Sequence, residues 1–492
     1  MKAAWYSRRA LRLAQRIDRF SAYLWARLRL PARATDLALL SKLNPADVCI
    51  LGSGPAGSVL GFDLVQRGWR VLIIESAADQ RFAGQGFRNS GELEYPFAAS
   101  RYRGFGGTSA LWFGACPRLR PIDFERNAYT PPGADWPLRY VDLEPYYDQA
   151  EQSLAVRYGP VGQGPKAGGA SCSNGAAGRW LEQAGLALEP SGVARAPGGP
   201  DCFRVARDLL PGYCRASGQA MLAIGTATEV LHDGDGRVYG LTVRDNNGRS
   251  VNLRARAYVL ACGGLETPRL LLASRSASFP DGIGNRSSLA GRFFMEHFKL
   301  RFRGTLRSAF SASGRCFQYY EQFKQQGLGS PILAVDLKRL RRSVVLGISA
   351  DVEMFPCRQN RVALAPDDSD RPGETGASLA LRLSDRDMET VEAVGALVCS
   401  IYKELGAKQV VALPGHVGHV SWLFHHMGTC RMGNDPSNSV IDANLRVHDS
   451  PNLYLAGSAP FVTGDGSNPT LTIAALSHRL ADHLHERLAG PA

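Results

Sequence analysis

VCILGSGPAGSVLGFDLVQRGWRVLIIES, residues 48–76, is the stretch that decides the fold of this chain. It predicts an apolar strand, a glycine-rich turn, a helix and a second apolar strand that ends at Glu75. Gly52 permits the tight turn, Gly54 lets the backbone approach a pyrophosphate, and Gly57 lets the helix pack closely against the strand. The helix N-terminus offers free N–H groups to phosphates, and Glu75 stands at the spacing where a carboxylate binds ribose hydroxyls. This order predicts a Rossmann-type dinucleotide-binding unit; the alternative is a glycine-rich turn with a solvated glutamate.

The remaining sequence predicts a second, sheet-containing domain. Residues 223–262 alternate between apolar and polar side chains and contain the turns DGDG and NNG, which predicts an antiparallel meander leading into one more core strand. Residues 301–422 mix alternating runs with a helical pattern at 385–404, and the chain ends in a predicted helix. Residues 159–200 predict mostly loop, and Asp142 is expected to be the N-cap of a short helix. The expected fold class is mixed α/β, a Rossmann-type domain with a second domain built on an antiparallel sheet.

Composition narrows the classes of function. The 492 residues, 45% of them hydrophobic, are enough to bury a large core in two domains, and no apolar run approaches the ~18 residues of a membrane-spanning helix. The ten cysteines are scattered without a CxxC pair, which favours a reducing compartment and predicts a cytoplasmic protein. The net charge of +12 is concentrated near the N-terminus, and no base-stacking or groove-reading module follows, so nucleic acid is not an expected partner. We find no metal-ligand spacing and expect no metal.

The first 45 residues predict a basic amphipathic helix. Leu13, Ile17, Phe20 and Leu24 recur at steps of four and three, while most of the arginines lie off that stripe. Such a helix can dock on its own protein or on another subunit, and the alternative is a peripheral contact with the inner, anionic face of a membrane.

Four segments resemble the glucose-methanol-choline (GMC) family of FAD-dependent oxidoreductases, in the family's order and from about residue 46 onward. They are the fingerprint above; GFGGTSALWFGA; VLACGGLETPRLLLAS with the following GRFFMEHF; and HHMGTCRMG through NLYLAGSAPFVTGDGSNPTLTIAALSHRLADHL. The NPTLT form is similar to the bacterial sugar-oxidising, pyranose-oxidase-like branch. The resemblance implies oxidation of a CH–OH group of a sugar, glycoside, aminocyclitol or similar polyol, with FAD as cofactor.

The resemblance also implies which residues bind FAD. Several members of the branch bind the flavin covalently through a histidine in front of the tryptophan of the second segment; here Leu111 precedes Trp112, so we expect non-covalent FAD. Ser458 stands where the family often has Asp, which weakens it as a ligand. The implied cofactor-binding residues are Gly52, Gly54, Gly57, Glu75, Gly106, Gly107, Thr108, Ser109, Val230, Gly263, Gly457, Pro469 and Thr470.

Oxidising an alcohol requires a base for the hydroxyl proton, and a neutral imidazole, with an ordinary pKa of about 6.5, suits that task. The resemblance assigns the base to His425 and the group that orients the hydroxyl to Asn468. The alternatives are core packing for His425 and an N-cap in front of Pro469 for Asn468. His426, Trp422, Asp465 and His297 are candidate wall residues with structural roles as the alternative, and Cys430 is not expected to be a nucleophile.

The resemblance divides the chain into a discontinuous FAD domain, residues 46–125, 215–300 and 440–492, and a substrate domain, residues 126–214 and 301–439, with the active site between them. Two other functions stay open: a non-redox lyase of hydroxynitrile type on the same fold, and an electron-passing subunit of a dehydrogenase assembly. The sequence also leaves open which alcohol is oxidised and whether dioxygen, a quinone or a cytochrome accepts the electrons.

Overall fold

The predicted N-terminal helix lies outside the part of the chain that the structure describes, apart from Leu37 and Pro45. A computed structural model describes residues 37, 45–77, 79–81, 86–158, 176–189, 192–195, 205–215, 219–245, 247–306, 312–340, 343–365, 374–415, 420–466 and 468–490.

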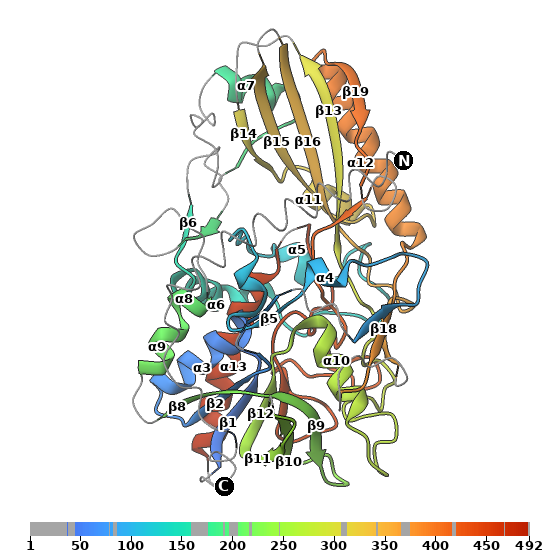
Figure 1. The fold of residues 1–492 in the computed structure, drawn as a ribbon. Helices are drawn as coiled ribbons and strands as arrows, with labels where there is room; N and C mark the ends of the chain where they lie inside the picture. The colour runs from blue at the N-terminus through green and yellow to red at the C-terminus, as the bar shows by residue number, and fades with distance from the viewer. Residues whose placement is uncertain are drawn as a thin grey trace.

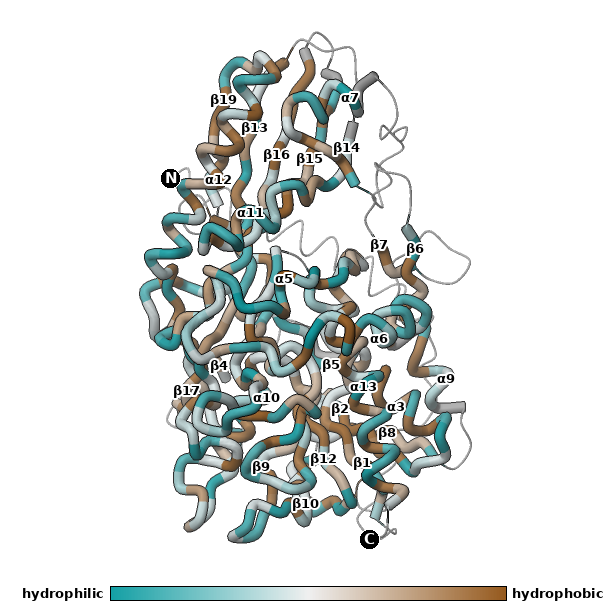
Figure 2. The backbone as a smooth tube through the Cα atoms, turned by 180° about the vertical axis from the view of Figure 1, so that it is seen from behind, coloured by the Kyte–Doolittle hydropathy of each residue, from teal (hydrophilic) through white to brown (hydrophobic). Residues whose placement is uncertain are grey.

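A five-stranded parallel sheet forms around the opening stretch. Its order is β21-β12-β1-β2-β8, with strands β1 (Ala46–Leu51), β2 (Val71–Glu75), β8 (Ala220–Ile224), β12 (Ala255–Leu260) and β21 (Leu453–Leu455). Every residue of β1 and β2 is buried, as expected for parallel strands covered on both faces, and both strands are coloured hydrophobic in Figure 2.

Helices cover one side of this sheet. Helix α3 (Pro55–Gln66) packs against α13 (Thr470–Ala489), and α13 packs in turn against α6 (Tyr140–Ser153), so the first and last helices of the domain lie side by side (Figure 1). The predicted C-terminal helix is confirmed as α13, and Leu471, Ala474, Ala475 and Leu480 lie on its buried side. The prediction that Asp142 is the N-cap of this helix is wrong. Arg139 is the N-cap, and Asp142 is the third residue of α6. The backbone N–H of Arg139 donates to the carboxylate of Asp142 at 2.8 Å.

The predicted meander is confirmed. Strands β9 (Thr226–His232), β10 (Val238–Arg244) and β11 (Ser250–Leu253) form a three-stranded antiparallel sheet, and the chain then enters β12 as expected. The meander lies beside β12 in Figure 1.

A second large sheet is antiparallel and carries the second hydrophobic cluster. Its order is β14-β15-β16-β13-β19, from β13 (His297–Leu306), β14 (Ala312–Cys316), β15 (Pro331–Leu340), β16 (Ser343–Glu353) and β19 (Lys408–Ala412), and β20 (Ser421–Trp422) also pairs with β13. Along β13 the apolar residues Phe298, Leu300 and Phe302 are buried, while Lys299 and Arg301 lie on the opposite face. Helix α12 (Asp385–Glu404) packs beside β13, with the bounds that the sequence predicted.

The other described elements are mostly short, and several, such as α4, α5 and β5, lie between the two sheets (Figure 1). They are β3 (Asp79–Arg81), β4 (Phe87–Asn89), α4 (Phe97–Ser100), β5 (Tyr102–Gly104), η1 (Gly107–Ala110), α5 (Pro121–Phe124), β6 (Val156–Tyr158), α7 (Ala176–Gln183), β7 (Gly192–Ala194), α8 (Val205–Asp208), α9 (Leu210–Arg215), α10 (Gly263–Ala273), α11 (Tyr320–Gln325), β17 (Arg361–Leu364) and β18 (Ala377–Ala380).

The predicted loop at 159–200 is wrong for part of the described chain, since α7 and β7 lie within it. The amphipathic signal there is short, and its buried anchor, Leu181, packs on the second hydrophobic cluster. No helix in the described ranges combines the length and the apolar character needed to cross a membrane.

Candidate active site

The turn after β1 is built from glycines that stand in tight contact with backbone. Gly52 has a φ of +99°, and a Cβ on it would lie 2.5 Å from the carbonyl oxygen of Ala261. A Cβ on Gly57 would lie 2.0 Å from the carbonyl oxygen of Gly52, so α3 rests directly on the turn. A Cβ on Gly54 would lie 4.0 Å from the Cα of Gly107, and α3 begins with Pro55. The helix N-terminus is therefore left accessible to an anionic group.

Glu75 ends β2 beside this turn. Its side chain is buried, and its two carboxylate oxygens accept hydrogen bonds from Ser53 (backbone N 3.1 Å, Oγ 2.8 Å) and from Ser76. Burial raises the pKa of Glu75, against the effect of these hydrogen bonds. The carboxylate thus has a fixed orientation at the carboxyl edge of the parallel sheet, the edge where such folds bind ligands.

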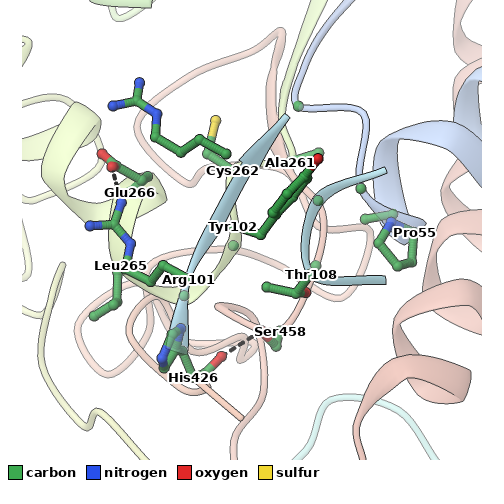
Figure 3. A pocket seen from close by; sticks show the side chains of 18 of the residues that line it. Pro55, Arg101, Tyr102, Thr108, Ala261, Cys262, Leu265, Glu266, His426 and Ser458 are labelled. Atoms are coloured by element: carbon green, nitrogen blue, oxygen red, sulfur yellow. Dashed lines mark hydrogen bonds and ion pairs between the residues drawn. The ribbon is translucent and has the colours of Figure 1, made fainter. Parts of the chain in front are cut away.

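A second glycine loop meets the first. Gly106 and Gly107 have φ angles of +87° and +52°, and a Cβ on Gly107 would lie 3.1 Å from the Cα of Gly54. The backbone N–H of Gly106 donates to Ser53 Oγ at 3.1 Å, and Ser109 Oγ donates to the carbonyl of Gly106 at 2.6 Å. Figure 3 shows Pro55 and Thr108 from the two loops on the same cavity wall.

One cavity runs along both loops, and most of the predicted site residues line it: Gly52, Gly54, Glu75, Gly107, Thr108, Ser109, Gly263, Gly457, His425, Asn468, Pro469 and Thr470. Gly57 and Gly106 lie behind it and support its turns. Val230 does not line it, because its side chain is buried in β9 and its N–H donates to Ser274 Oγ at 2.8 Å. Gly225, Thr226 and Ala227 form that wall instead. Because β8 pairs with β2 in parallel, these three residues, which follow β8, lie at the edge of the sheet where Glu75 lies. Aligning the two strands in the sequence could have predicted this position.

A buried charged cluster on the cavity wall was not predicted. Arg101 and Arg269 both form ion pairs with Glu266, which lies in the first turn of α10 (Figure 3 shows the Arg101 pair). Burial acts to raise the pKa of Glu266, but the charges of Arg269 and Arg101 outweigh it and hold that pKa well below its ordinary value. The cluster fixes the loop that precedes Gly106 against the helix that follows Gly263.

His425 and Asn468 converge on the cavity from segments 43 residues apart, with His425 Nε2 at 2.8 Å from the amide nitrogen of Asn468. Asn468 does not cap α13, because Pro469 occupies the N-cap position and no side chain caps the helix. Its amide is directed to the imidazole instead.

The surroundings of His425 favour the neutral imidazole. Burial lowers its pKa to about 3, and the positive charges of Lys299 and Arg315 act in the same direction. Its second ring nitrogen, Nδ1, lies 2.8 Å from Nδ1 of His297, the fully buried first residue of β13. A ring with one hydrogen-bonded nitrogen inside the protein and the other at a cavity can exchange a proton with a bound molecule.

The other candidate wall residues lie near this pair. His426 lines the cavity, and its Nε2 lies 2.8 Å from the hydroxyl of Tyr95; Figure 3 shows its carbonyl accepting from Ser458. Trp422 is buried beside Tyr95. Asp465 is buried as well. Burial also raises the pKa of the Cys430 thiol to about 12, in agreement with the expectation that it is no nucleophile.

These features fit an FAD. The glycine turns leave room for a backbone-bound pyrophosphate at the N-terminus of α3, Glu75 stands at the ribose edge, and His425 with Asn468 lines the same cavity.

Comparison with known proteins shows which families this chain resembles. A family model described as GMC oxidoreductase matches residues 356–477, and one described as FAD dependent oxidoreductase matches residues 47–280. The chain is 28% identical to 6'''-hydroxyparomomycin C oxidase of Streptomyces lividus, over 89% of this chain and 92% of that protein. It is 26% identical to the fructose dehydrogenase large subunit of Gluconobacter japonicus, over 89% and 97%.

The structure is similar to that of pyridoxine 4-oxidase from Mesorbium loti, with a TM-score of 0.64 and 19% identity over 90% of this chain and 99% of that one. This likeness shows a shared fold. Because two family models and relatives along nearly the whole chain agree, the chain belongs to the glucose-methanol-choline (GMC) family and is an FAD-dependent oxidoreductase.

Proposed function

We propose that the protein oxidises a CH–OH group of a sugar, glycoside, aminocyclitol or similar polyol. The observation that carries the proposal is that His425 and Asn468 both line the cavity that runs along the two glycine loops, and that their side chains contact each other there. The names of two relatives, 6'''-hydroxyparomomycin C oxidase and fructose dehydrogenase large subunit, support a carbohydrate-like substrate.

FAD, when bound, supplies the acceptor for the hydride that leaves the substrate carbon. His425 takes the hydroxyl proton at Nε2, since burial keeps that ring neutral. Asn468 cannot act as a base near neutral pH, so its amide orients the hydroxyl toward Nε2.

We also propose that the flavin is held without a covalent bond. Leu111 lines the cavity at the position where several members of the branch carry the linking histidine, and a leucine side chain has no nucleophilic atom. Denaturation in acid should therefore release all of the FAD into the supernatant.

An anaerobic titration tests the proposal. Mixed with a panel of sugars, glycosides and aminocyclitols in the absence of oxygen, the FAD-loaded enzyme should lose its yellow absorbance with at least one of them. A protein that stays yellow with every alcohol but cleaves a hydroxynitrile would be a lyase and would contradict the proposal. Admitting air afterwards assigns the acceptor: recovery of the colour indicates an oxidase, and recovery only with a quinone or dye indicates a dehydrogenase.

A further inference from the structure

The two histidines His297 and His425 face each other through the same kind of nitrogen. Their Nδ1 atoms are 2.8 Å apart, and their rings meet edge to face with centroids 5.0 Å apart at 76°. In a hydrogen bond between two imidazoles, one nitrogen must donate and the other must accept. The tautomers of the two rings are therefore coupled.

The proposed reaction selects one of the two arrangements. His425 can accept the substrate proton at Nε2 only if that nitrogen is bare, so its own proton must be on Nδ1. Among the described residues, Nδ1 of His297 is the atom that can accept a hydrogen bond from that N–H. We propose that His297 is a positioning residue that accepts from Nδ1–H of His425 and so keeps Nε2 of His425 free as the base. This inference rests on the proposed function.

His297 can accept because it stays neutral. Burial lowers its pKa well below the ordinary value, and the positive charge of Lys324 acts in the same direction. Glu353, its cross-strand neighbour on β16, is bound to Lys324 at 3.2 Å. Among the described residues, other charged groups near the pair include Lys299, Arg315 and Glu296.

The backbone holds the two rings at hydrogen-bond distance. The carboxylate of Glu296 accepts from the backbone N–H of His297 through one oxygen and from that of His425 through the other, and it also accepts from Tyr95 Oη at 2.8 Å. The N–H of Leu423 donates to the carbonyl of His297 at 3.0 Å. These contacts bind the start of β13 to the segment that carries the base, although the two are 128 residues apart.

The far side of the His297 ring is also enclosed. A Cβ on Gly464 would lie 3.2 Å from His297 Nε2, and that nitrogen is buried without a hydrogen-bond partner among the described residues. A flip of the ring about its Cβ–Cγ bond would place a carbon, Cδ2, where Nδ1 now lies, so the hydrogen bond to His425 requires the observed ring orientation. Nδ1 is the nitrogen of His297 that lies at hydrogen-bond distance from His425.

The proton balance of the step is simple. The substrate O–H bond breaks and an N–H bond forms at Nε2 of His425, which becomes an imidazolium with a proton on each nitrogen. The proton on Nδ1 remains donated to His297, and this hydrogen bond strengthens because its donor is now charged.

The tautomer of His425 can be measured directly by ¹⁵N NMR. We would label the FAD-loaded protein with ¹⁵N in the histidine rings and assign His425 as the signal that disappears in His425→Asn. The expected spectrum shows a protonated Nδ1 and a bare Nε2. A proton on Nε2 in the wild-type protein would overturn the inference. Because this readout uses no substrate, a failure of the proposed function, shown by flavin that no alcohol bleaches, is a separate result.

Two variants separate positioning from packing. Asparagine places an acceptor oxygen close to the position of Nδ1, whereas leucine fills the space without one. We expect His297→Leu to lower the rate constant of anaerobic flavin reduction ~100-fold or more and to move the His425 proton to Nε2, as loss of a tautomer-fixing acceptor does elsewhere. His297→Asn should restore most of the rate and the wild-type tautomer. Equal loss in both variants, with an unchanged His425 spectrum, would assign His297 a packing role and contradict the inference.

Discussion

His425 is kept neutral by its surroundings and not by the pH of the solution. Burial lowers its pKa to about 3, and Lys299 and Arg315 contribute in the same direction. An exposed imidazole with a pKa of about 6.5 would be ~97% protonated at pH 5 and useless as a base. A base with a pKa near 3 loses its function only when the pH falls toward that value.

The first prediction follows from the lowered pKa of His425. Between pH 8 and pH 5 the rate constant of anaerobic flavin reduction should show no decline caused by protonation of His425, because the ring stays neutral throughout this range. Stopped-flow mixing at saturating substrate measures it.

Glu296 provides the control, since burial raises its pKa to about 7 against the effect of its hydrogen bonds to Tyr95 and to two backbone amides. A change near pH 7 that disappears in Glu296→Gln belongs to that carboxyl group. A 30-fold decline toward pH 5 that persists in Glu296→Gln would show an exposed, titrating base and contradict the account.

At the scale of the element, the contact between α3 and the turn after β1 depends on one missing side chain. Gly57 lies inside a helix, where glycine ordinarily costs stability relative to alanine, about 1 kcal/mol. A Cβ here would lie 2.0 Å from the carbonyl oxygen of Gly52, which is backbone and cannot move aside. Close packing of helix and strand thus outweighs helix propensity at this position.

A matched pair of substitutions tests this contact. Gly395 also lies within a helix, α12, and a Cβ there would meet nothing within 4 Å. We expect Gly395→Ala to stabilise the protein by up to ~1 kcal/mol and Gly57→Ala to destabilise it by ~2–3 kcal/mol with loss of bound FAD. Urea unfolding and the flavin-to-protein absorbance ratio measure both effects. Equal effects of the two substitutions would contradict the packing argument.

Local sequence predicted elements best where their ends carry chemical signals. The bounds of α12 were predicted from its helical pattern, and the structure shows that Ser384 and Asp387 form a capping box at its start. The stretch 159–200 was predicted to be mostly loop because it is rich in glycine and proline. Helix α7 forms there because Leu181 packs on the second hydrophobic cluster, a contact that no local pattern specifies. Asn468 matches a helix cap by position, yet its side chain contacts His425, which no local pattern specifies.

At the scale of the whole molecule, a buried ionic cluster joins the antiparallel sheet to α5 and α11. Lys324 of α11 forms ion pairs with Asp123 of α5 and with Glu353 of β16, and all three side chains are at most 1% exposed. Lys324 also donates to the carbonyl of Gly464, in the loop that encloses His297. The cluster therefore fixes the position of the antiparallel sheet relative to the loop beside His297.

Removing the lysine should be costly. Lys324→Met leaves two buried carboxyl groups without their cation, and we expect a loss of ~3–5 kcal/mol in the free energy of unfolding. Lys338→Met removes an exposed ion pair with Asp336 and should change the same quantity by less than ~1 kcal/mol. Chemical denaturation of both variants compares them. A similar small effect in each would show that the cluster does not hold the molecule together.

The site was predicted only as far as sequence motifs reach. The glycine turns and Glu75 follow from local pattern, and the roles of His425 and Asn468 were inferred from resemblance. His297 was considered only as a wall residue, because its contact with His425 spans 128 residues and depends on how β13 packs. Val230 is buried and does not line the cavity, and the sequence pattern did not specify which residues of its strand lie at the cavity edge.

The most direct measurement is the rate constant of anaerobic flavin reduction by a bleaching alcohol in His425→Ala, with His485→Ala as a control histidine that contacts Trp69 away from the cavity. We predict that His425→Ala retains FAD but is reduced ~10²–10⁴-fold more slowly, the usual contribution of a general base, while His485→Ala behaves as wild type. Reduction of His425→Ala at the wild-type rate would show that another group takes the proton and would contradict the central claim.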